Sequence, residues 1–270
     1  MAADADGQVD VIGHILDHHS LEVPFINAHH IFDGHIELPH FEVFGIDMSI
    51  TRHVVMMWVA SALLILTMLA SFRRPSMVPT GLANFLETIV VFLKDEVIMP
   101  VMGESGKTFL PFLLTIFFFI LYCNMLGLIP YTATATGNIS VTAALALISF
   151  TVTQGAGIVN NGFFSHWKNL VPGGLPAPLL IIMIPIEIIG MLAKPFALCI
   201  RLFANMIAGH IAILVFLGLI IMLKSYLVAP ASIALAAALY MLEIFIGFVQ
   251  AFIFTLLTAL FVSMAAHPDH

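Results

Sequence analysis

Charged side chains are scarce in this sequence of 270 residues: Asp, Glu, Lys and Arg make up 9% of it, whereas 61% of the residues are hydrophobic. A soluble domain normally carries about 25% charged residues. A surface this poor in charge has to face lipid. Alternating strands of about ten residues separated by turns are also missing, which argues against a membrane barrel. The sequence therefore predicts an all-α, polytopic membrane protein.

The motifs of several catalytic classes are missing as well. The sequence has no Walker A motif, so we expect no nucleotide chemistry by the chain itself, and neither HExxH nor GxSxG, which argues against an intramembrane hydrolase. Its two cysteines, Cys123 and Cys199, lie in apolar runs without CxxC spacing and are expected to be small core residues. We therefore expect a non-catalytic protein with no metal and no cofactor, surrounded by lipid and without a nucleic-acid partner.

Positive charge is absent from residues 1–48, which contain nine acids and seven of the twelve histidines, among them His18, His19, His29 and His30. A segment without Lys or Arg crosses a membrane readily, which favours an N-terminus on the outer side. Metal binding by the histidines is one interpretation, and a solvated, partly ordered acidic arm is the one we favour. The predicted domains are this arm, 1–48, and a membrane domain, 49–270.

Three hydrophobic runs in the first part of the membrane domain are long enough to cross a bilayer, at about 49–72, 108–129 and 139–159. The first stops at two arginines and a proline, a basic boundary typical of the inner side. Residues 79–101 mix apolar residues with four charged ones, a composition that suits an amphipathic helix at the inner interface.

Two further apolar stretches, 178–222 and 229–265, are too long for a simple crossing. As helices they would measure about 67 Å and roughly 55 Å, against a hydrocarbon core of about 30 Å. The first stretch is either two short spans with a tight turn near Lys194 and Pro195, or one strongly tilted helix. No turn-forming cluster stands there, and prolines can kink a membrane helix without ending it. We predict an antiparallel hairpin of two strongly tilted helices, and five crossings with the C-terminus inside.

Charged side chains recur in the first long stretch at a regular spacing. Glu187, Lys194 and Arg201 are seven residues apart, which puts them on one stripe of a helix at steps of about 10.5 Å. Each costs about 2.5–3.5 kcal/mol or more at bilayer depth and needs a partner or water. The alternative is a purely structural network, and Lys194 could also reach the inner interface with its long side chain.

The second long stretch offers partners for these groups. In an antiparallel hairpin, pairs whose residue numbers have nearly equal sums lie at equal height, so Arg201 is expected opposite Gln250, and His210 opposite Glu243. His210, however, follows Arg201 by nine residues, about 180° around an ideal helix. Either the helix is irregular near Gly209, or the two residues serve different faces.

These residue types together favour proton passage. His and Glu titrate in an accessible range, whereas Arg keeps its charge in a protein. A permanent cation between two aqueous cavities would block a continuous proton path while attracting a carboxylate. Arg201 is thus expected to be a gate and a counter-ion.

Three runs of sequence resemble subunit a of F-type ATP synthases: IEIIGMLAKPFALCIRLFANMIAGH at 186–210, LEIFIGFVQAFIFTLLTALFVSMA at 242–265, and NMLGLIP followed by a Thr-rich loop. The resemblance covers about 110–270. It implies that Arg201 is the family's essential arginine, facing the carboxylate of the rotating c-ring. It also implies that Asn205, His210, Glu243 and Gln250 belong to the outer half-channel, and Glu187 to the inner one.

The same resemblance implies a stator subunit of the Fo motor that couples proton flow to rotation and ATP synthesis. Its partners would be the c-ring, subunit b and the other synthase subunits, in the inner membrane of a bacterium. A secondary transporter is an alternative class, but it usually contains two repeated halves, which this sequence lacks. A membrane scaffold is another, but it would not need Glu, Lys and Arg at core depth.

Overall fold

The computed structural model describes most of the residues after position 50 and, before that position, a few short strands. The described residues are 20–22, 35–37, 42–43, 46–47, 51–73, 79–129, 132, 134–168, 177–223 and 229–266. His18, His19, His29 and His30 lie outside them. The boundary of the acidic arm at residue 48 stays a prediction.

Two small antiparallel ladders lie in the N-terminal region, where the sequence indicated only a partly ordered arm. Strand β1 (Ser20–Glu22) pairs with β2 (His35–Glu37), and β3 (Glu42–Val43) pairs with β4 (Ile46–Asp47). Strands of two or three residues are too short for hydrophobic periodicity to reveal them.

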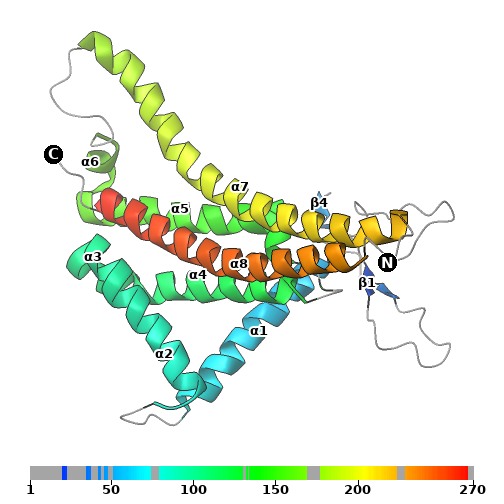
Figure 1. Cartoon of the computed structure of the whole chain (residues 1–270). Helices are drawn as coiled ribbons and strands as arrows, with labels where there is room; N and C mark the ends of the chain where they lie inside the picture. Colours follow the sequence, from blue (N-terminus) through cyan, green and yellow to red (C-terminus); the bar gives the residue numbers. More distant parts are fainter. Residues whose placement is uncertain are drawn as a thin grey trace. The chain divides into compact units, whose positions relative to one another are not determined.

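The rest of the described chain is helical (Figure 1). Five helices are long and apolar enough to cross a membrane, counting the continuous helical run from Leu82 to Gly127 as one. This confirms the predicted number of crossings. The long helices are α1 (Arg52–Phe72), α4 (Gly106–Gly127), α5 (Ile139–Asn161), α7 (Ala177–Leu223) and α8 (Ala229–Ala266).

Residues 79–101 form the amphipathic segment that the sequence predicts. It consists of α2 (Leu82–Phe92), the π-helical turn η1 (Leu93–Ile98) and α3 (Met99–Met102), followed by the 3₁₀ turn η2 (Gly103–Ser105). Its charged side chains are exposed, and its buried residues are Leu86, Leu93, Val97, Ile98 and Met102. A location at the membrane interface remains a prediction.

Helix α7 is one continuous α-helix of 47 residues that includes Pro185 and Pro195. The alternative of two short spans joined by a tight turn is therefore wrong. Few of its side chains are buried, and large apolar ones such as Ile189 and Phe196 are more than 60% exposed. Such a helix needs lipid or another subunit around it.

A short helix, α6 (Phe163–Lys168), follows α5 where the sequence predicted only an inner loop. Gly162 separates the two helices with a φ of +80°, a conformation that favours glycine. The amide of Gly162 donates to the carbonyl of Ile158, and the amide of His166 donates to the carbonyl of Gly162. Helix α5 thus ends in a turn that starts the next helix.

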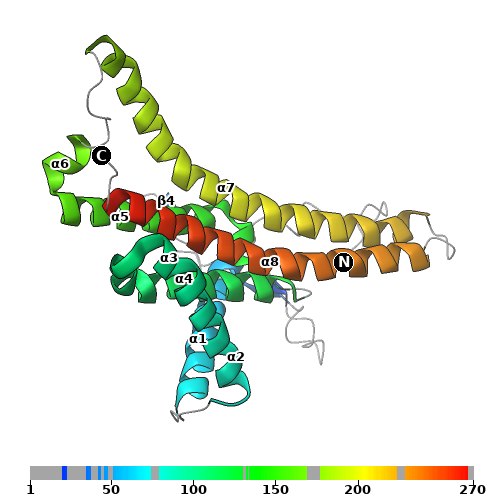
Figure 2. The same ribbon diagram turned by 60° about the vertical axis from the view of Figure 1, so that its left-hand side comes forward.

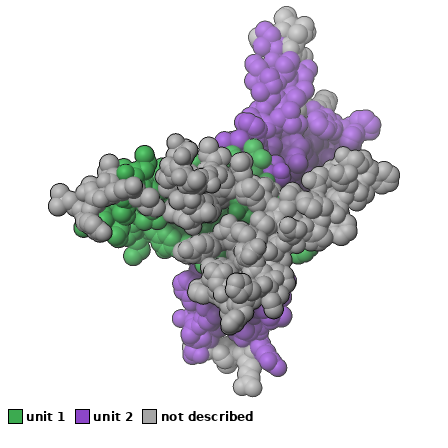
Figure 3. Space-filling model, turned by 90° about the vertical axis from the view of Figure 1, so that its right-hand side faces the viewer, with its two compact units in different colours: residues 1–64, 119–139, 202–249 green, residues 65–118, 140–201, 250–270 purple. Residues whose placement is uncertain are grey.

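The chain divides into two compact units (Figure 3). Unit 1 comprises residues 1–64, 119–139 and 202–249, and unit 2 comprises residues 65–118, 140–201 and 250–270. In unit 1 the end of α7 and the start of α8 run side by side, in yellow and orange in Figures 1 and 2. The short 3₁₀ turn η3 (Ala135–Gly137) also belongs to unit 1, where Ala60, Cys123 and Ala135 form a buried cluster.

Unit 2 has its own core on α3, α4, α5 and α8. Buried there are Ile98, Met102, Leu113, Ala156, Ala259 and Val262. Polar contacts join its helices as well: Ser149 on α5 lies 2.8 Å from Thr258 on α8, and Asn161 donates to the carbonyl of Ala265. Small residues and hydroxyls let membrane helices approach closely.

Candidate functional site

The histidine and glutamate that the sequence placed opposite each other form the centre of a polar group in unit 1. His210 Nδ1 lies 2.7 Å from Glu243 Oε1, which joins α7 to α8. Nε2 of the same ring lies 3.0 Å from the carbonyl oxygen of Gly127 and 2.9 Å from Thr134 Oγ1. We call His210, Glu243, Thr134 and Gly127 the His210 cluster. The predicted pairing of His210 with Glu243 is confirmed.

The hydrogen bonds of the His210 cluster determine the protonation state of one nitrogen of the His210 ring, Nε2. A carbonyl oxygen can only accept, so Nε2 carries a hydrogen and donates toward Gly127. The contact between Nδ1 and Oε1 then holds one further proton, which either makes the pair an imidazolium and a carboxylate or leaves a neutral ring beside a carboxylic acid. Both forms keep the hydrogen bond. The pair can therefore take up and release a proton with little movement.

Glu243 is suited to exchange protons because only one of its carboxylate oxygens forms a hydrogen bond within the described segments. The side chain is 4% exposed, and its Oε2 is buried without a hydrogen-bond partner within the described part of the chain. A buried carboxylate oxygen needs a donor, and water is the obvious one in a polar site. Gly209 lies directly against this carboxylate and leaves room for it.

A second histidine supports the cluster from α1. His53 is buried, and its Nδ1 donates to the carbonyl oxygen of Thr134 over 3.0 Å. The hydroxyl of Thr134 also lies 3.3 Å from the carbonyl of Gly127. His53, Thr134 and Gly127 were not predicted as site residues from the sequence. A histidine at the start of an apolar span and a Thr-rich loop were the signals that pointed to the first two.

Asn124 links α4 to α8 through a hydrogen bond next to the His210 cluster. Its Nδ2 donates to the carbonyl of Gly247 over 3.0 Å, and its Oδ1 accepts from Thr136 Oγ1 over 2.7 Å. Close approach is possible because Gly247 has no side chain: a β-carbon there would lie 3.3 Å from the β-carbon of Asn124. Nearby, Tyr240 donates to the carbonyl of Leu128. These bonds hold the part of α8 that carries Glu243.

Arg201 is different from the other site residues. Its side chain is exposed, and it makes no hydrogen bond or ion pair with any residue that the structure describes. Gln250 is 5% exposed, and no hydrogen bond joins it to Arg201, so their juxtaposition stays a prediction. Asn205 is half-buried. Helix α7 is regular through Gly209, which answers the question that the sequence left open: Arg201 and His210 have different surroundings.

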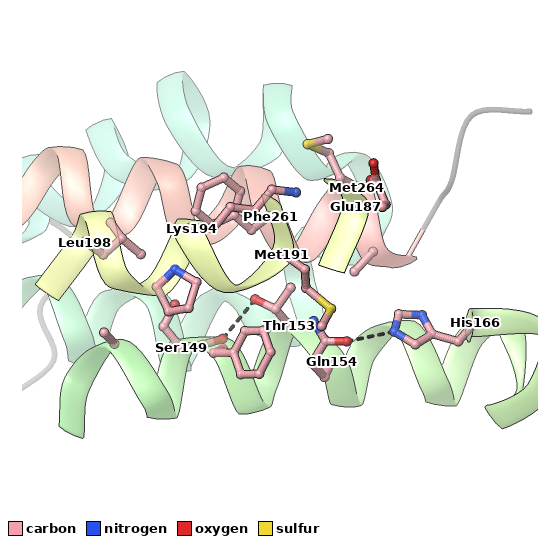
Figure 4. A pocket seen from close by; sticks show the side chains of 14 residues that line it. Ser149, Thr153, Gln154, His166, Glu187, Met191, Lys194, Leu198, Phe261 and Met264 are labelled. Atoms are coloured by element: carbon pink, nitrogen blue, oxygen red, sulfur yellow. Dashed lines mark hydrogen bonds between the residues drawn. The ribbon is translucent and has the colours of Figure 1, made fainter. Parts of the chain in front are cut away.

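Two further predicted site residues, Glu187 and Lys194, line a pocket in unit 2 (Figure 4). It has a volume of about 150 Å³, enough for several waters. Helix α7 contributes Glu187 and Lys194, and α5 contributes Ser149, Thr153 and Gln154. Apolar residues of α8 complete the wall, and Lys194 Nζ lies 5.3 Å from the ring centroid of one of them, Phe261. We call this the Glu187 pocket.

His166 of α6 also lines the Glu187 pocket, and the sequence gave it no role. It is 7% exposed, and its Nε2 donates to Gln154 Oε1 over 2.8 Å. The ring packs on Gly157 of α5, where a side chain would collide with it. Its signal in the sequence was a titratable residue in the turn that follows a span.

Metal-ligating groups do not gather within the described segments: no set of three or more His, Cys, Asp or Glu residues there could hold a metal ion. The two sites contain His, Glu, hydroxyl groups and room for water, which can exchange protons.

Known sequences resemble this chain over nearly its full length. Residues 54–263 match the family described as ATP synthase A chain. The chain is 48% identical to ATP synthase subunit a of Chloroherpeton thalassium, over 97% of this chain and 78% of that relative. It is 49% identical to ATP synthase subunit a of an Anaeromyxobacter species, over 91% and 61%, and 48% identical to ATP synthase subunit a 2 of Chlorobaculum tepidum, over 95% and 74%. With a match over most of its membrane helices, this chain belongs to the ATP synthase A chain family.

Proposed function

We propose that this chain is the stator subunit of the membrane motor of an F-type ATP synthase. In this role it provides two aqueous half-channels that pass protons to and from carboxylates on a ring of c subunits. The observation that carries the proposal is the exposed side chain of Arg201, a permanent cation on an apolar helix without a partner among the described residues. Such a cation calls for an anion on another subunit.

The His210 cluster serves as the outer half-channel in this proposal. A proton from outside reaches Glu243, whose Oε2 has no partner within the described segments, and enters the hydrogen bond to His210. Because Nε2 keeps its hydrogen and donates it to the carbonyl of Gly127, the exchangeable proton is the one between Nδ1 and Oε1. From there it passes by Asn205 and Gln250 to a carboxylate of the ring.

Arg201 separates the two paths. A protonated ring carboxylate is neutral and can turn into lipid. A carboxylate that has lost its proton is held by the guanidinium. Because Arg201 does not give up its own proton, protons cannot pass directly from one half-channel to the other. Each elementary charge that crosses is worth about 2.3 kcal/mol per 100 mV, so several crossings are summed through rotation for each ATP.

The Glu187 pocket serves as the inner half-channel. Its carboxylate, hydroxyls and room for water give a proton from the ring a polar path out of the membrane. Lys194 adds a positive charge to the same pocket, next to the ring of Phe261.

The proposed role also implies where the chain is located and which subunits it contacts. The chain would lie in the inner membrane of a bacterium, with the acidic arm outside and the C-terminus in the cytoplasm. It would contact the c-ring, subunit b and the other synthase subunits. It would itself catalyse no reaction on nucleotides.

The test is the variant Arg201→Ala in the complete synthase. ATP synthesis and ATP-driven proton pumping in membrane vesicles should both fall to background, while the ring of small subunits still copurifies. Lys107→Ala is the matched control, because Lys107 is also an exposed cation but pairs with Glu104 over 2.6 Å. Its activities should stay normal. Coupled synthesis by Arg201→Ala would refute the proposal.

A further inference from the structure

Helix α6 is amphipathic in an unusual way, with a single histidine on its buried side. Phe163, Phe164 and Trp167 are 57%, 87% and 44% exposed, whereas His166 is 7% exposed. Trp is enriched at the membrane–water interface, and the exposed Trp167 fits that location. Helix α6 would thus lie where the Glu187 pocket meets water, and it turns His166 into that pocket.

The ring of His166 has one nitrogen engaged and one available. Nε2 donates to Gln154 Oε1, and because an amide oxygen can only accept, Nε2 carries the hydrogen. Nδ1 then has its lone pair, and it makes no hydrogen bond with a residue in the described segments. A neutral imidazole held in this way can take a proton on Nδ1 without losing its bond to Gln154.

The surroundings of the ring favour a proton carrier over a fixed ion pair. The charged groups of the pocket are Glu187 and Lys194, both on α7, and neither forms an ion pair with His166. Helix α5 presents the uncharged Ser149, Thr153 and Gln154, and α8 presents no titratable side chain to the pocket. The ring lines the pocket with its Nδ1 side against Gly157 of α5, and no ion pair with a described residue fixes its charge.

We propose that His166 transfers protons between the water of the Glu187 pocket and the aqueous medium at the inner surface. Nδ1 accepts a proton from a hydronium ion or a protonated carboxyl on one side, giving an imidazolium, and releases it to water on the other, so that the ring returns to its neutral form. The direction reverses between synthesis and pumping. This inference rests on the proposed role of the pocket as the inner half-channel.

The experiment measures ATP-driven proton pumping by inverted membrane vesicles that contain the complete synthase, since pumping draws protons through the inner half-channel from the medium. The variants are His166→Ala and His166→Gln, whose amide can still donate to Gln154. We expect the pumping rate to fall roughly tenfold, less than the 10²–10⁴ of an obligatory acid–base group because water bypasses the ring. The deficit should grow as the pH of the medium rises, because the hydronium ions that could enter the pocket without the ring become scarcer.

Chemical rescue separates proton transfer from a structural role. Imidazole added to the medium should restore pumping by His166→Ala, whereas thiazole, of the same size but not a base near neutral pH, should not. If His166→Ala does not assemble, the pH profile of His166→Gln decides. Normal pumping by both variants at every pH would overturn the inference, and so would equal rescue by thiazole or a deficit that does not change with pH.

Arg201→Ala, measured in parallel, distinguishes the two proposals. Loss of pumping in Arg201→Ala together with normal pumping in both His166 variants would refute the role of His166 alone. Retained pumping in Arg201→Ala would refute the function of the whole chain, whatever the His166 variants do.

Discussion

Gly209 and Glu243 touch across the pair of helices in unit 1: a β-carbon on Gly209 would lie 2.7 Å from Glu243 Oε1. That oxygen is the one bonded to His210. The absence of a side chain at position 209 is therefore a condition for the bond that we propose as the proton-exchanging contact.

Gly209→Ala should displace the Glu243 carboxylate and weaken its bond to His210. We expect ATP-driven pumping to fall by roughly tenfold or more, the equivalent of about 1.4 kcal/mol, with the synthase still assembled. Gly218→Ala is the matched control, because Gly218 lies on the same helix and a β-carbon there meets nothing within 4 Å. Equal pumping by the two variants would show that the position of this carboxylate does not matter.

The hydroxyl of Thr134 should matter more than its methyl group. Thr134→Val removes an acceptor 2.9 Å from His210 Nε2 and leaves the backbone carbonyl that binds His53 in place. A lost hydrogen bond of about 1 kcal/mol corresponds to roughly a fivefold decrease in pumping rate. Thr134→Ser keeps the hydroxyl and should pump nearly as the unmodified protein does. A larger loss in Thr134→Ser than in Thr134→Val would contradict this role.

Asn124 should contribute to stability more than to proton transfer. Asn124→Ala removes two hydrogen bonds between helices and a loop, to Gly247 and Thr136. At about 0.6 kcal/mol for each bond in a membrane protein, the free energy of unfolding should fall by about 1 kcal/mol. The measurement is detergent-induced unfolding of the purified chain in mixed micelles.

Thr136→Val removes one of these bonds and should cost about half as much. In the double variant the two losses should be less than additive, because the bond between Asn124 and Thr136 can be lost only once. Thr151→Ala, which affects an exposed hydroxyl bonded to its own helix, serves as the control. Full additivity would mean that the two side chains act independently.

The sequence predicted the five long helices well because each is strongly apolar. The predicted runs 178–222 and 229–265 end within one residue of α7 and α8. The pairing of His210 with Glu243 followed from antiparallel geometry alone. Partners that are backbone groups could not be predicted this way: the carbonyl of Gly127 has no signature in its residue type. The contact of His166 with Gln154 depends on how the turn at Gly162 directs α6, which periodicity does not reveal.

Only the chemistry of Arg201 could be predicted, because no residue in the described part of the chain pairs with its side chain. The sequence indicated a permanent cation on a helix, and the structure adds that its side chain is exposed. The predicted position of Arg201 opposite Gln250 rested on the same sums of residue numbers that correctly paired His210 with Glu243. Such sums give the height of a residue along the helix axis but not the direction in which its side chain points around that axis.

The two charges of the Glu187 pocket allow a last test of its function. Glu187→Gln removes the one carboxylate that the described residues contribute to the pocket and should slow synthesis and pumping alike, because a proton loses its acceptor in both directions. Lys194→Met keeps the length of the side chain but removes the cation over Phe261, while Lys194→Arg keeps the charge. If the charge of Lys194 is needed in the pocket, Lys194→Met should slow pumping and Lys194→Arg should not. Phe261→Leu removes the cation–π contact, worth about 0.5–2 kcal/mol, without changing any charge. A loss of pumping in Phe261→Leu as large as in Lys194→Met would mean that the position of the lysine, and not its charge, controls the pocket.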